Sequence, residues 1–202
     1  MVFISDSTGV ILAGGENRRM PVLKGFIRVH GKPIIERNLN LMKGLFQEVF
    51  IITNQPEFYI HLDARLFGDV YDIRGPMTGI LTALMNAKNK WVFITACDMP
   101  FIDEGVIRYL SSKRDDYDAV LFKSEPLLAF YSKSLLNPME EALISGKNGI
   151  NDFLKDKRVK YIKSCEIKGW ERSFINLNTP WDVEKVGANL CVHPKTERGK
   201  EG

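Results

Sequence analysis

The stretch GVILAGG at residues 9–15 decides how this chain folds. An unbroken run of small and apolar residues predicts a strand buried on both faces, because a half-exposed strand would alternate apolar and polar residues. The glycine pair at its end predicts a tight turn. A buried strand that runs into such a turn is typical of a parallel sheet covered by helices, in which ligands bind at the carboxyl ends of strands.

Further short apolar runs alternate with helical patterns along the chain. The alternation predicts a Rossmann-like three-layer α/β/α fold with a mostly parallel sheet, to which the C-terminal half adds antiparallel strands or a small flap. We expect one domain over residues 1–186, with halves at about 8–123 and 124–186, and a frayed polar tail at 187–202. Strands are expected at 9–13, 49–53, 91–95, 119–122, 127–131, 159–163 and 174–177, and helices at 33–46, 77–86, 103–112, 134–144 and from 180 onward.

Composition excludes several classes of protein. With 45% hydrophobic and 26% charged residues, the chain is neither collagen-like, coiled-coil nor disordered. Its 28 basic and 25 acidic residues are interspersed, so the charge of +3 gives no nucleic-acid-binding surface and favours a small anionic substrate. The sequence lacks a membrane-length apolar run and a signal-peptide pattern, and its three cysteines show no disulfide or zinc spacing, so we expect a cytoplasmic protein.

The loop after the first strand carries phosphate-binding chemistry. Gly14 and Gly15 let backbone N–H groups approach a phosphate, and Arg19 and Lys24 supply cationic donors to its oxygens. The sequence contains neither the Gly-x-x-x-x-Gly-Lys-Ser/Thr string nor the Gly-x-Gly-x-x-Gly string of other phosphate loops. On these residues alone, a plain glycine turn with solvated arginines remains an alternative.

Asp98 follows the apolar run at 91–95 and precedes Pro100, which stops the strand. A carboxylate delivered to the carboxyl end of a strand suits Mg²⁺, which binds one or two carboxylates and completes its shell with water and phosphate oxygens. The alternative is a helix-capping aspartate, but Asp103 is better placed for that role.

Together these motifs resemble the molybdenum cofactor guanylyltransferases, the MobA-type nucleotidyltransferases. The segment LAGGENRRMPVLK at 12–24 is similar to the family signature Leu-Ala-Gly-Gly-x-Ser-x-Arg-Met-Gly-x-Asp-Lys. Asn17, Pro21 and Leu23 depart from it, and Pro21 removes one backbone N–H from the loop. Across about residues 9–185, further resemblance lies in GKPII at 31–35, GPMTG at 75–79, CDMP at 97–100, EPLLA at 125–129 and FINLNTPWD at 174–182.

The resemblance implies the transfer of GMP from GTP to the phosphate of molybdenum-bound molybdopterin, with release of pyrophosphate. It implies catalytic roles for Arg19, Lys24 and Asp98, with Asp98 holding Mg²⁺. Asn176 and Asn178, which strand alternation would place on one face, are expected to hold the acceptor. The residues implied for GTP are Leu12, Ala13, Gly14, Gly15, Lys24, Asn54, Asp72 and Asp98.

Three alternatives remain open at this stage. The chain could instead be a cytidylyl- or uridylyltransferase of the same fold. It could also be a non-catalytic nucleotide-binding homologue, a hypothesis favoured by the departures from the family signature at Pro21 and Leu23. Asn54 also has a simpler explanation as a turn residue at a strand end. As partners we expect the two substrates and transient contact with molybdoenzyme apoproteins or their chaperones, and neither nucleic acid nor membrane.

Overall fold

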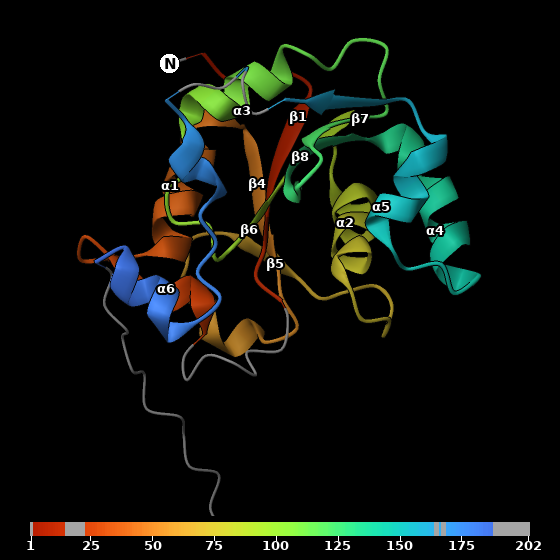
Figure 1. Ribbon diagram of the computed structural model, residues 1–202. Coiled ribbons are helices and arrows are strands. Elements are labelled where there is room, and N and C mark those ends of the chain that lie inside the picture. Colours follow the sequence, from red (N-terminus) through yellow and green to blue (C-terminus); the bar gives the residue numbers. More distant parts are fainter. Residues whose placement is uncertain (1, 15–22, 164–165, 167–168, 188–202) are drawn as a thin grey trace, which may run out of the picture.

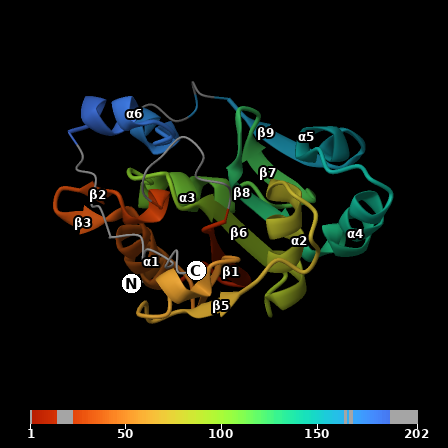
Figure 2. The ribbon, with the colours of Figure 1, turned by 90° about the horizontal axis from the view of Figure 1, so that it is seen from below.

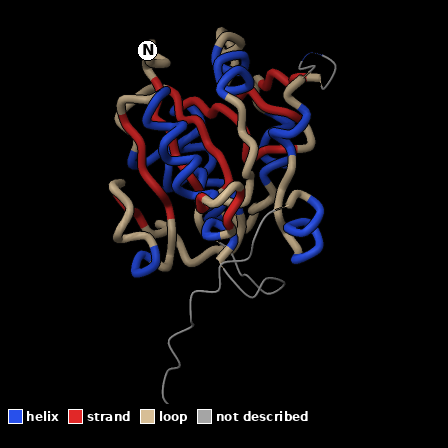
Figure 3. The backbone as a smooth tube through the Cα atoms, turned by 90° about the vertical axis from the view of Figure 1, so that its left-hand side faces the viewer, coloured by secondary structure: helices blue, strands red, loops and turns tan. Residues whose placement is uncertain are grey.

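A computed structural model describes residues 2–14, 23–163, 166 and 169–187. Its centre is a seven-stranded twisted sheet in the order β5-β4-β1-β6-β8-β7-β9, and β2 and β3 form a separate small hairpin (Figure 1). The strands lie side by side in the backbone tube of Figure 3. Their bounds are β1 Ser7–Leu12, β2 Arg28–Val29, β3 Lys32–Pro33, β4 Glu48–Ile52, β5 Arg65–Phe67, β6 Trp91–Ala96, β7 Ala119–Phe122, β8 Glu125–Ser132 and β9 Val159–Ile162.

Helices cover both faces of this sheet, so the predicted three-layer fold is confirmed. Helices α1 and α3 pack on one face and α2, α4 and α5 on the other (Figures 1 and 2), each with its own apolar cluster. The helices are α1 Ile34–Leu45, α2 Pro76–Asn86, α3 Glu104–Ser111, α4 Leu136–Ile144, α5 Ile150–Phe153 and α6 Pro180–Lys185. Short 3₁₀ helices lie at Lys24–Phe26, Pro56–Phe58, Lys133–Leu135, Leu154–Asp156 and Glu171–Phe174.

Strand β1 is the centre of the fold. It pairs in parallel with β4 on one side and β6 on the other, so that Leu12 lies opposite both Ile52 and Ala96. Its side chains alternate between the two faces: Ile11 enters the cluster beneath α1 and α3, and Val10 and Leu12 enter the cluster beneath α2. Because its side chains are buried on both faces of the sheet, the sequence of β1 is a continuous apolar run.

The C-terminal half adds strands to the same sheet. Strand β8 runs antiparallel to both β6 and β7, which confirms the expected antiparallel contribution. Strand β9, in contrast, pairs in parallel with β7. The strands β6, β7 and β9 therefore all end at the same edge of the sheet as β1.

Two helices begin at side-chain caps, and the cap at Asp103 confirms the prediction. The Asp103 carboxylate accepts a hydrogen bond from the Gly105 N–H at 2.7 Å, at the start of α3. The hydroxyl of Thr179 and the carboxylate of Asp182 form a reciprocal capping box at the start of α6. Helix α4 tolerates Pro138 because this residue lies in the first turn, where no intrahelical N–H is needed.

The expected strand at 174–177 is wrong. Residues 171–174 form a 3₁₀ helix, and residues 175–178 have no regular secondary structure. This segment is held by two separate contacts and not by strand pairing. The ring of Phe174 packs edge-on against that of Phe122, with the ring centroids 4.6 Å apart. The Leu177 N–H donates a hydrogen bond to the Asp98 carbonyl at 3.0 Å. Among the described residues, no helix is long and apolar enough to cross a membrane.

Gly9 is required in β1 because α1 lies close above it. A Cβ at this position would lie 2.7 Å from Cδ2 of Phe46, a buried ring that stacks on Phe93. We therefore expect Gly9→Ala to lower the free energy of unfolding by about 1–3 kcal/mol, because the core is overpacked. Urea denaturation measures this change.

Gly44→Ala is the matched control for this prediction. Gly44 lies in α1 and a Cβ there meets nothing within 4 Å, so alanine should raise the free energy of unfolding by up to ~1 kcal/mol. Equal effects of the two substitutions would contradict the packing argument.

Candidate functional site

Polar residues gather at the edge where the parallel strands end. The register aligns these ends, because the Ala13 N–H donates to the Ile52 carbonyl at 2.8 Å and the Cys97 N–H to the Leu12 carbonyl at 3.0 Å. In spatial order along the edge, the residues are Asp69 after β5, Asn54 after β4, Gly14 after β1, Asp98 after β6 and Glu125 at the start of β8.

Lys24 joins two of the other predicted site residues. Its Nζ lies 2.9 Å from Oδ2 of Asp98 and 2.5 Å from Oδ1 of Asn178. The side chains of Lys24 and Asp98 are 23% and 15% exposed, so this ion pair is shielded from water but still open on one side. Residues 74 and 154 positions away from Lys24 in sequence thus meet at one point. Arg19 and Gly15 lie outside the described residues.

The two glycines of the GPMTG segment have structural roles. Gly75 has φ of +139°, which an L side chain rarely adopts, at the start of α2. Gly79 packs against Leu12, whose methyl groups would lie 3.2 and 3.3 Å from an added Cβ. The backbone conformation of Gly75 and the close packing of Gly79 on β1 therefore explain the glycines of this motif, and Gly14 remains the exposed glycine at the end of β1.

Asn54 is paired with Asp69, an aspartate that was not among the predicted site residues. Its Nδ2 donates to Oδ2 of Asp69 at 2.8 Å, and its Oδ1 accepts from the Asp69 N–H at 2.8 Å. Burial raises the pKa of Asp69, and its Oδ1 is buried without a hydrogen-bond partner among the described residues. Asp72 is exposed, and its role in GTP binding stays a prediction.

The signal for Asp69 was weak but present in the sequence. Asp69 follows the short apolar pair of β5 by two residues, as Asp98 follows β6. A three-residue strand at the edge of a sheet is too short to give a periodic pattern, so its carboxyl end could not be located before the fold was known.

A second pair involves Glu125 and Asn176. The Asn176 Nδ2 donates to the Glu125 carboxylate at 2.7 Å, and the Asn176 Oδ1 is buried without a partner among the described residues. Burial raises the pKa of Glu125, and the negative charge of Asp98 raises it further. Asn178 contacts Lys24 instead, and because residues 175–178 are not a strand, the alternation that was expected to place both asparagines on one face does not apply.

A bulge in β8 brings Glu125 to this position. Phe122 pairs with Glu125, whereas the preceding residue Leu121 already pairs with Ala129. The intervening residues include Pro126, which has no N–H for the ladder. Bulges redirect side chains next to active sites, and this one brings a carboxylate into the electrostatic reach of Asp98.

The donor chemistry at Asp98 fits Mg²⁺. Within the part of the chain that the structure describes, no three His, Cys, Asp or Glu side chains form a metal cluster, so a zinc site with three or four protein ligands is not formed there. A single partly exposed carboxylate at a strand end is the kind of ligand that Mg²⁺ uses when water and phosphate oxygens complete its shell.

The chain is similar in sequence to known proteins over most of its length. The MobA-like NTP transferase domain matches residues 9–161. The "Probable molybdenum cofactor guanylyltransferase" of Carboxydothermus hydrogenoformans is 35% identical over 190 residues, which cover 91% of this chain and 96% of the relative. The "Molybdenum cofactor guanylyltransferase" of Desulfosudis oleivorans is 34% identical over 192 residues, with 91% and 95% covered.

A solved structure extends the likeness to three dimensions. The crystal structure of molybdopterin-guanine dinucleotide biosynthesis protein A from Archaeoglobus fulgidus superposes with a TM-score of 0.77 at 25% sequence identity. The superposition covers 89% of this chain and 96% of that chain.

The raised pKa of Glu125 predicts a pH-dependent cost to stability. An acid whose folded pKa lies above its unfolded value of about 4.5 holds its proton more tightly in the folded state, so stability falls as pH rises between the two values. Glu125→Gln lacks this loss. We therefore expect the free energy of unfolding of the variant, relative to wild type, to rise with pH through that window, as measured by urea denaturation.

Glu48→Gln provides a control of opposite sign. Burial raises the pKa of Glu48, but hydrogen bonds from Thr8, the Lys88 N–H and Arg65 outweigh it and lower the pKa. Above about pH 4.5 the wild type should therefore have a higher free energy of unfolding than this variant. This difference should disappear as pH falls through the pKa of Glu48 in the folded protein. If the free energy of unfolding relative to wild type changed with pH in the same direction for Glu125→Gln and Glu48→Gln, the opposite pKa shifts given to these two residues would be wrong.

Proposed function

Because the chain belongs to the MobA-like NTP transferase family and is a nucleotidyltransferase, we propose that it transfers GMP from GTP to the phosphate of molybdenum-bound molybdopterin, releasing pyrophosphate. The observation that carries this proposal is the cluster of Lys24, Asp98 and Asn178 at the carboxyl ends of the central strands. It supplies one cation and one carboxylate where a triphosphate and a divalent metal would lie.

The order of residues along the sheet edge gives the substrates an orientation. The Asn54–Asp69 pair lies on the β4 and β5 side, Gly14 and Asp98 lie at the centre, and the Glu125–Asn176 pair lies on the β8 side. A nucleotide along this edge would place its base at β4 and β5 and its phosphates at β1 and β6. The first half of the chain would thus hold the nucleotide, and Glu125 with the C-terminal segment would hold the acceptor.

Asp69 has the chemistry to select guanine. A carboxylate accepts hydrogen bonds from N1–H and the 2-amino group of guanine, and Asp69 has one buried oxygen with no partner in the described residues. Cytosine and uracil present a carbonyl oxygen at the corresponding edge, which the carboxylate would repel. Asn54 holds the carboxylate in place through two hydrogen bonds, so its role is one of positioning.

The transfer step needs charge neutralisation and alignment, not a general base. The acceptor is a phosphate monoester whose second pKa is about 6, so it is mostly ionised near neutral pH. The ammonium group of Lys24 would neutralise the negative charge that grows on the pyrophosphate, and Asp98 would hold Mg²⁺. The metal, when bound, would withdraw charge from the phosphate oxygens.

Lys24→Ala and Asp98→Ala test the proposed chemistry. Each variant should lose about 10²–10³-fold in kcat, because a donor or the metal ligand that stabilises the transferring phosphate is removed. Pyrophosphate release from GTP, Mg²⁺ and molybdopterin measures the loss, and thermal unfolding verifies that each variant folds.

Lys43→Ala and Asp63→Ala are the matched controls. They break an exposed ion pair of 2.6 Å elsewhere on the surface and should leave turnover unchanged. If Lys24→Ala or Asp98→Ala turned over as fast as these controls, the proposed roles would be rejected. GTP binding without any pyrophosphate release by the wild type would favour a non-catalytic nucleotide-binding protein.

Asp69→Asn tests base selection. Loss of the carboxylate should weaken GTP binding by about 1–3 kcal/mol. It should also reduce the difference in affinity between GTP and either CTP or UTP, as measured by calorimetry with Mg²⁺. The variant should still be folded, because a neutral amide does not bear the cost of ionisation that raises the pKa of Asp69.

Asp72→Asn is the matched comparison in the same segment. Asp72 is exposed, so a loss of GTP preference in this variant and not in Asp69→Asn would move base recognition to Asp72. A wild-type preference for CTP or UTP would identify the chain as a cytidylyl- or uridylyltransferase of this fold.

A further inference from the structure

Two buried threonines of α2 hold the loop that precedes this helix. The loop, residues 68–75, joins β5 to α2 and contains no helix or strand (Figure 1). Near its start, the Val70 N–H donates a hydrogen bond to Oγ1 of Thr82 at 3.1 Å. Near its end, the Ile73 carbonyl accepts a hydrogen bond from Oγ1 of Thr78 at 2.7 Å. The loop is therefore attached to α2 near both of its ends.

Packing alone does not explain a threonine at position 82. The side chains of Thr78 and Thr82 are fully buried, and their neighbours Ile80 and Leu81 on α2 belong to the apolar cluster beneath this helix. A hydroxyl in such surroundings costs free energy unless it is hydrogen-bonded, and threonine is a weaker helix former than leucine or alanine. Valine would fill the same space without a polar group.

The hydroxyl of Thr82 is fixed as an acceptor. It donates its single hydrogen to the Thr78 carbonyl, one helical turn earlier, at 2.9 Å. A hydroxyl has one donor and two acceptor sites, so its remaining capacity is to accept a hydrogen bond. The Val70 N–H uses this capacity. Because a β-branched side chain has few rotamers in a helix, the position of this acceptor follows from the position of α2.

Asp69 lies between two peptide groups that are both held. The peptide before it is held because the Asp69 N–H donates to Oδ1 of Asn54 at 2.8 Å. The peptide after it is held because the Val70 N–H donates to Thr82. With both peptide planes fixed, the backbone at Asp69 can turn little about φ and ψ. Asn54 and Thr82 together therefore set the direction of the Asp69 carboxylate, whose Oδ1 has no partner among the described residues.

We propose that Thr82 is a positioning residue for base selection, which holds the Val70 N–H and through it the carboxylate of Asp69. Thr82 has no exposed surface, so it acts without touching a nucleotide. This inference rests on the proposed function, because it explains what keeps the carboxylate directed at the guanine base. It makes helix α2, and not only the ends of the strands, a determinant of specificity.

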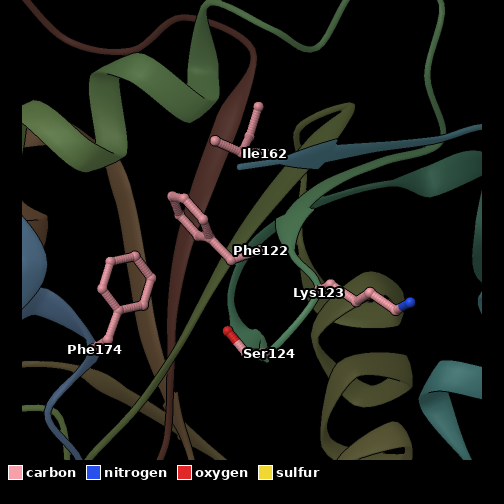
Figure 4. Close-up of a pocket in the computed structure, with 5 residues that line it drawn as sticks. All are labelled: Phe122, Lys123, Ser124, Ile162 and Phe174. Carbon is pink, nitrogen blue, oxygen red and sulfur yellow. The ribbon is translucent and has the colours of Figure 1, made fainter. Parts of the chain in front are cut away.

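The loop lies at a distance from the cluster of Lys24 and Asp98. Three strand spacings, about 14 Å, separate β5, which precedes Asp69, from β6, which precedes Asp98. The cavity that Figure 4 shows lies further along the sheet, at the ends of β7 and β9. A shift of the loop should therefore alter the binding of the base and leave the transfer chemistry unchanged.

Thr82→Val removes the hydroxyl and keeps the shape of the side chain. Calorimetry with Mg²⁺ should show GTP binding about tenfold weaker and CTP binding unchanged, because the loop loses its hydrogen bond at Val70. In assays of pyrophosphate release, the KM for GTP should rise by about the same factor, and kcat should stay as in the wild type. Equal GTP binding by Thr82→Val and the wild type would overturn the proposal.

Two further substitutions at this position separate the hydroxyl from the packing. Thr82→Ser keeps the hydroxyl and should retain most of the preference for GTP over CTP. Thr82→Ala removes the hydroxyl but is a better helix former, so it should fold and should lose the preference as Thr82→Val does. A loss of preference in Thr82→Ser as large as that in Thr82→Ala would show that the hydroxyl is not the cause.

A double variant tests whether Thr82 acts through Asp69. In the Asp69→Asn background, Thr82→Val should cause little further loss of preference for GTP over CTP, because the carboxylate that it positions is already absent. If the two losses added, Thr82 would act independently of Asp69 and the proposal would be wrong.

Thr8→Val and Ser124→Ala are the controls. Thr8 is a fully buried threonine near the other end of β1, and its hydroxyl donates to Glu48. Ser124 is exposed and lines the cavity of Figure 4, on the other side of β6. Neither substitution should change the relative affinity for GTP and CTP. If Thr8→Val reduced the preference as much as Thr82→Val, a general loss of stability would explain the effect and the proposal would fall.

These outcomes are separable from the proposed function. If the wild type preferred CTP and Thr82→Val reduced that preference, the guanylyl transfer would be wrong while the positioning role of Thr82 stood. If the wild type preferred GTP and Thr82→Val kept that preference in full, only the role of Thr82 would be wrong. A wild type without any base preference would overturn both.

Discussion

Parallel pairing of β1 with both of its neighbours is the constraint on which the rest of the structure depends. The register sets Leu12 opposite both Ile52 and Ala96, so three strands end together and their following residues meet at one edge. Burial on both faces fixes this register, because a shift of one residue would exchange the two apolar clusters that the side chains of β1 fill. Packing requirements in the core therefore determine where the polar residues of the site lie.

Among the described residues, the charge at this edge is arranged around the ion pair of Lys24 and Asp98. Lys24 bonds Asp98 and Asn178, and the Leu177 N–H bonds the Asp98 carbonyl, so the C-terminal segment is attached to the strand that carries the carboxylate. The negative charge of Asp98 also extends to Glu125, whose pKa it raises. Lys24 and the segment at 177–178 thus meet at the site through hydrogen bonds, and not through a strand ladder.

Two orphaned oxygens show where the protein accepts a cost in stability. Oδ1 of Asp69 and Oδ1 of Asn176 are both buried without partners among the described residues, and they stand on opposite sides of Asp98. Each such oxygen costs about 1–3 kcal/mol if nothing else satisfies it. A ligand that donates a hydrogen bond to either oxygen would remove this cost.

The layered fold, the central strand and the place of Asp98 at a strand end could be predicted from sequence, because long apolar runs and the residues that follow them are local signals. The cap at Asp103 could also be predicted, because its partner Gly105 lies two residues away. Which polar residues contact one another depends on how the chain is packed. Asp69 follows a strand too short to show periodicity, and the contacts of Asn176 and Asn178 depend on a segment whose alternating pattern imitates a strand but which packs as a 3₁₀ turn and irregular chain. Side-chain pairing across 51 and 154 residues follows from strand order, which no local pattern contains.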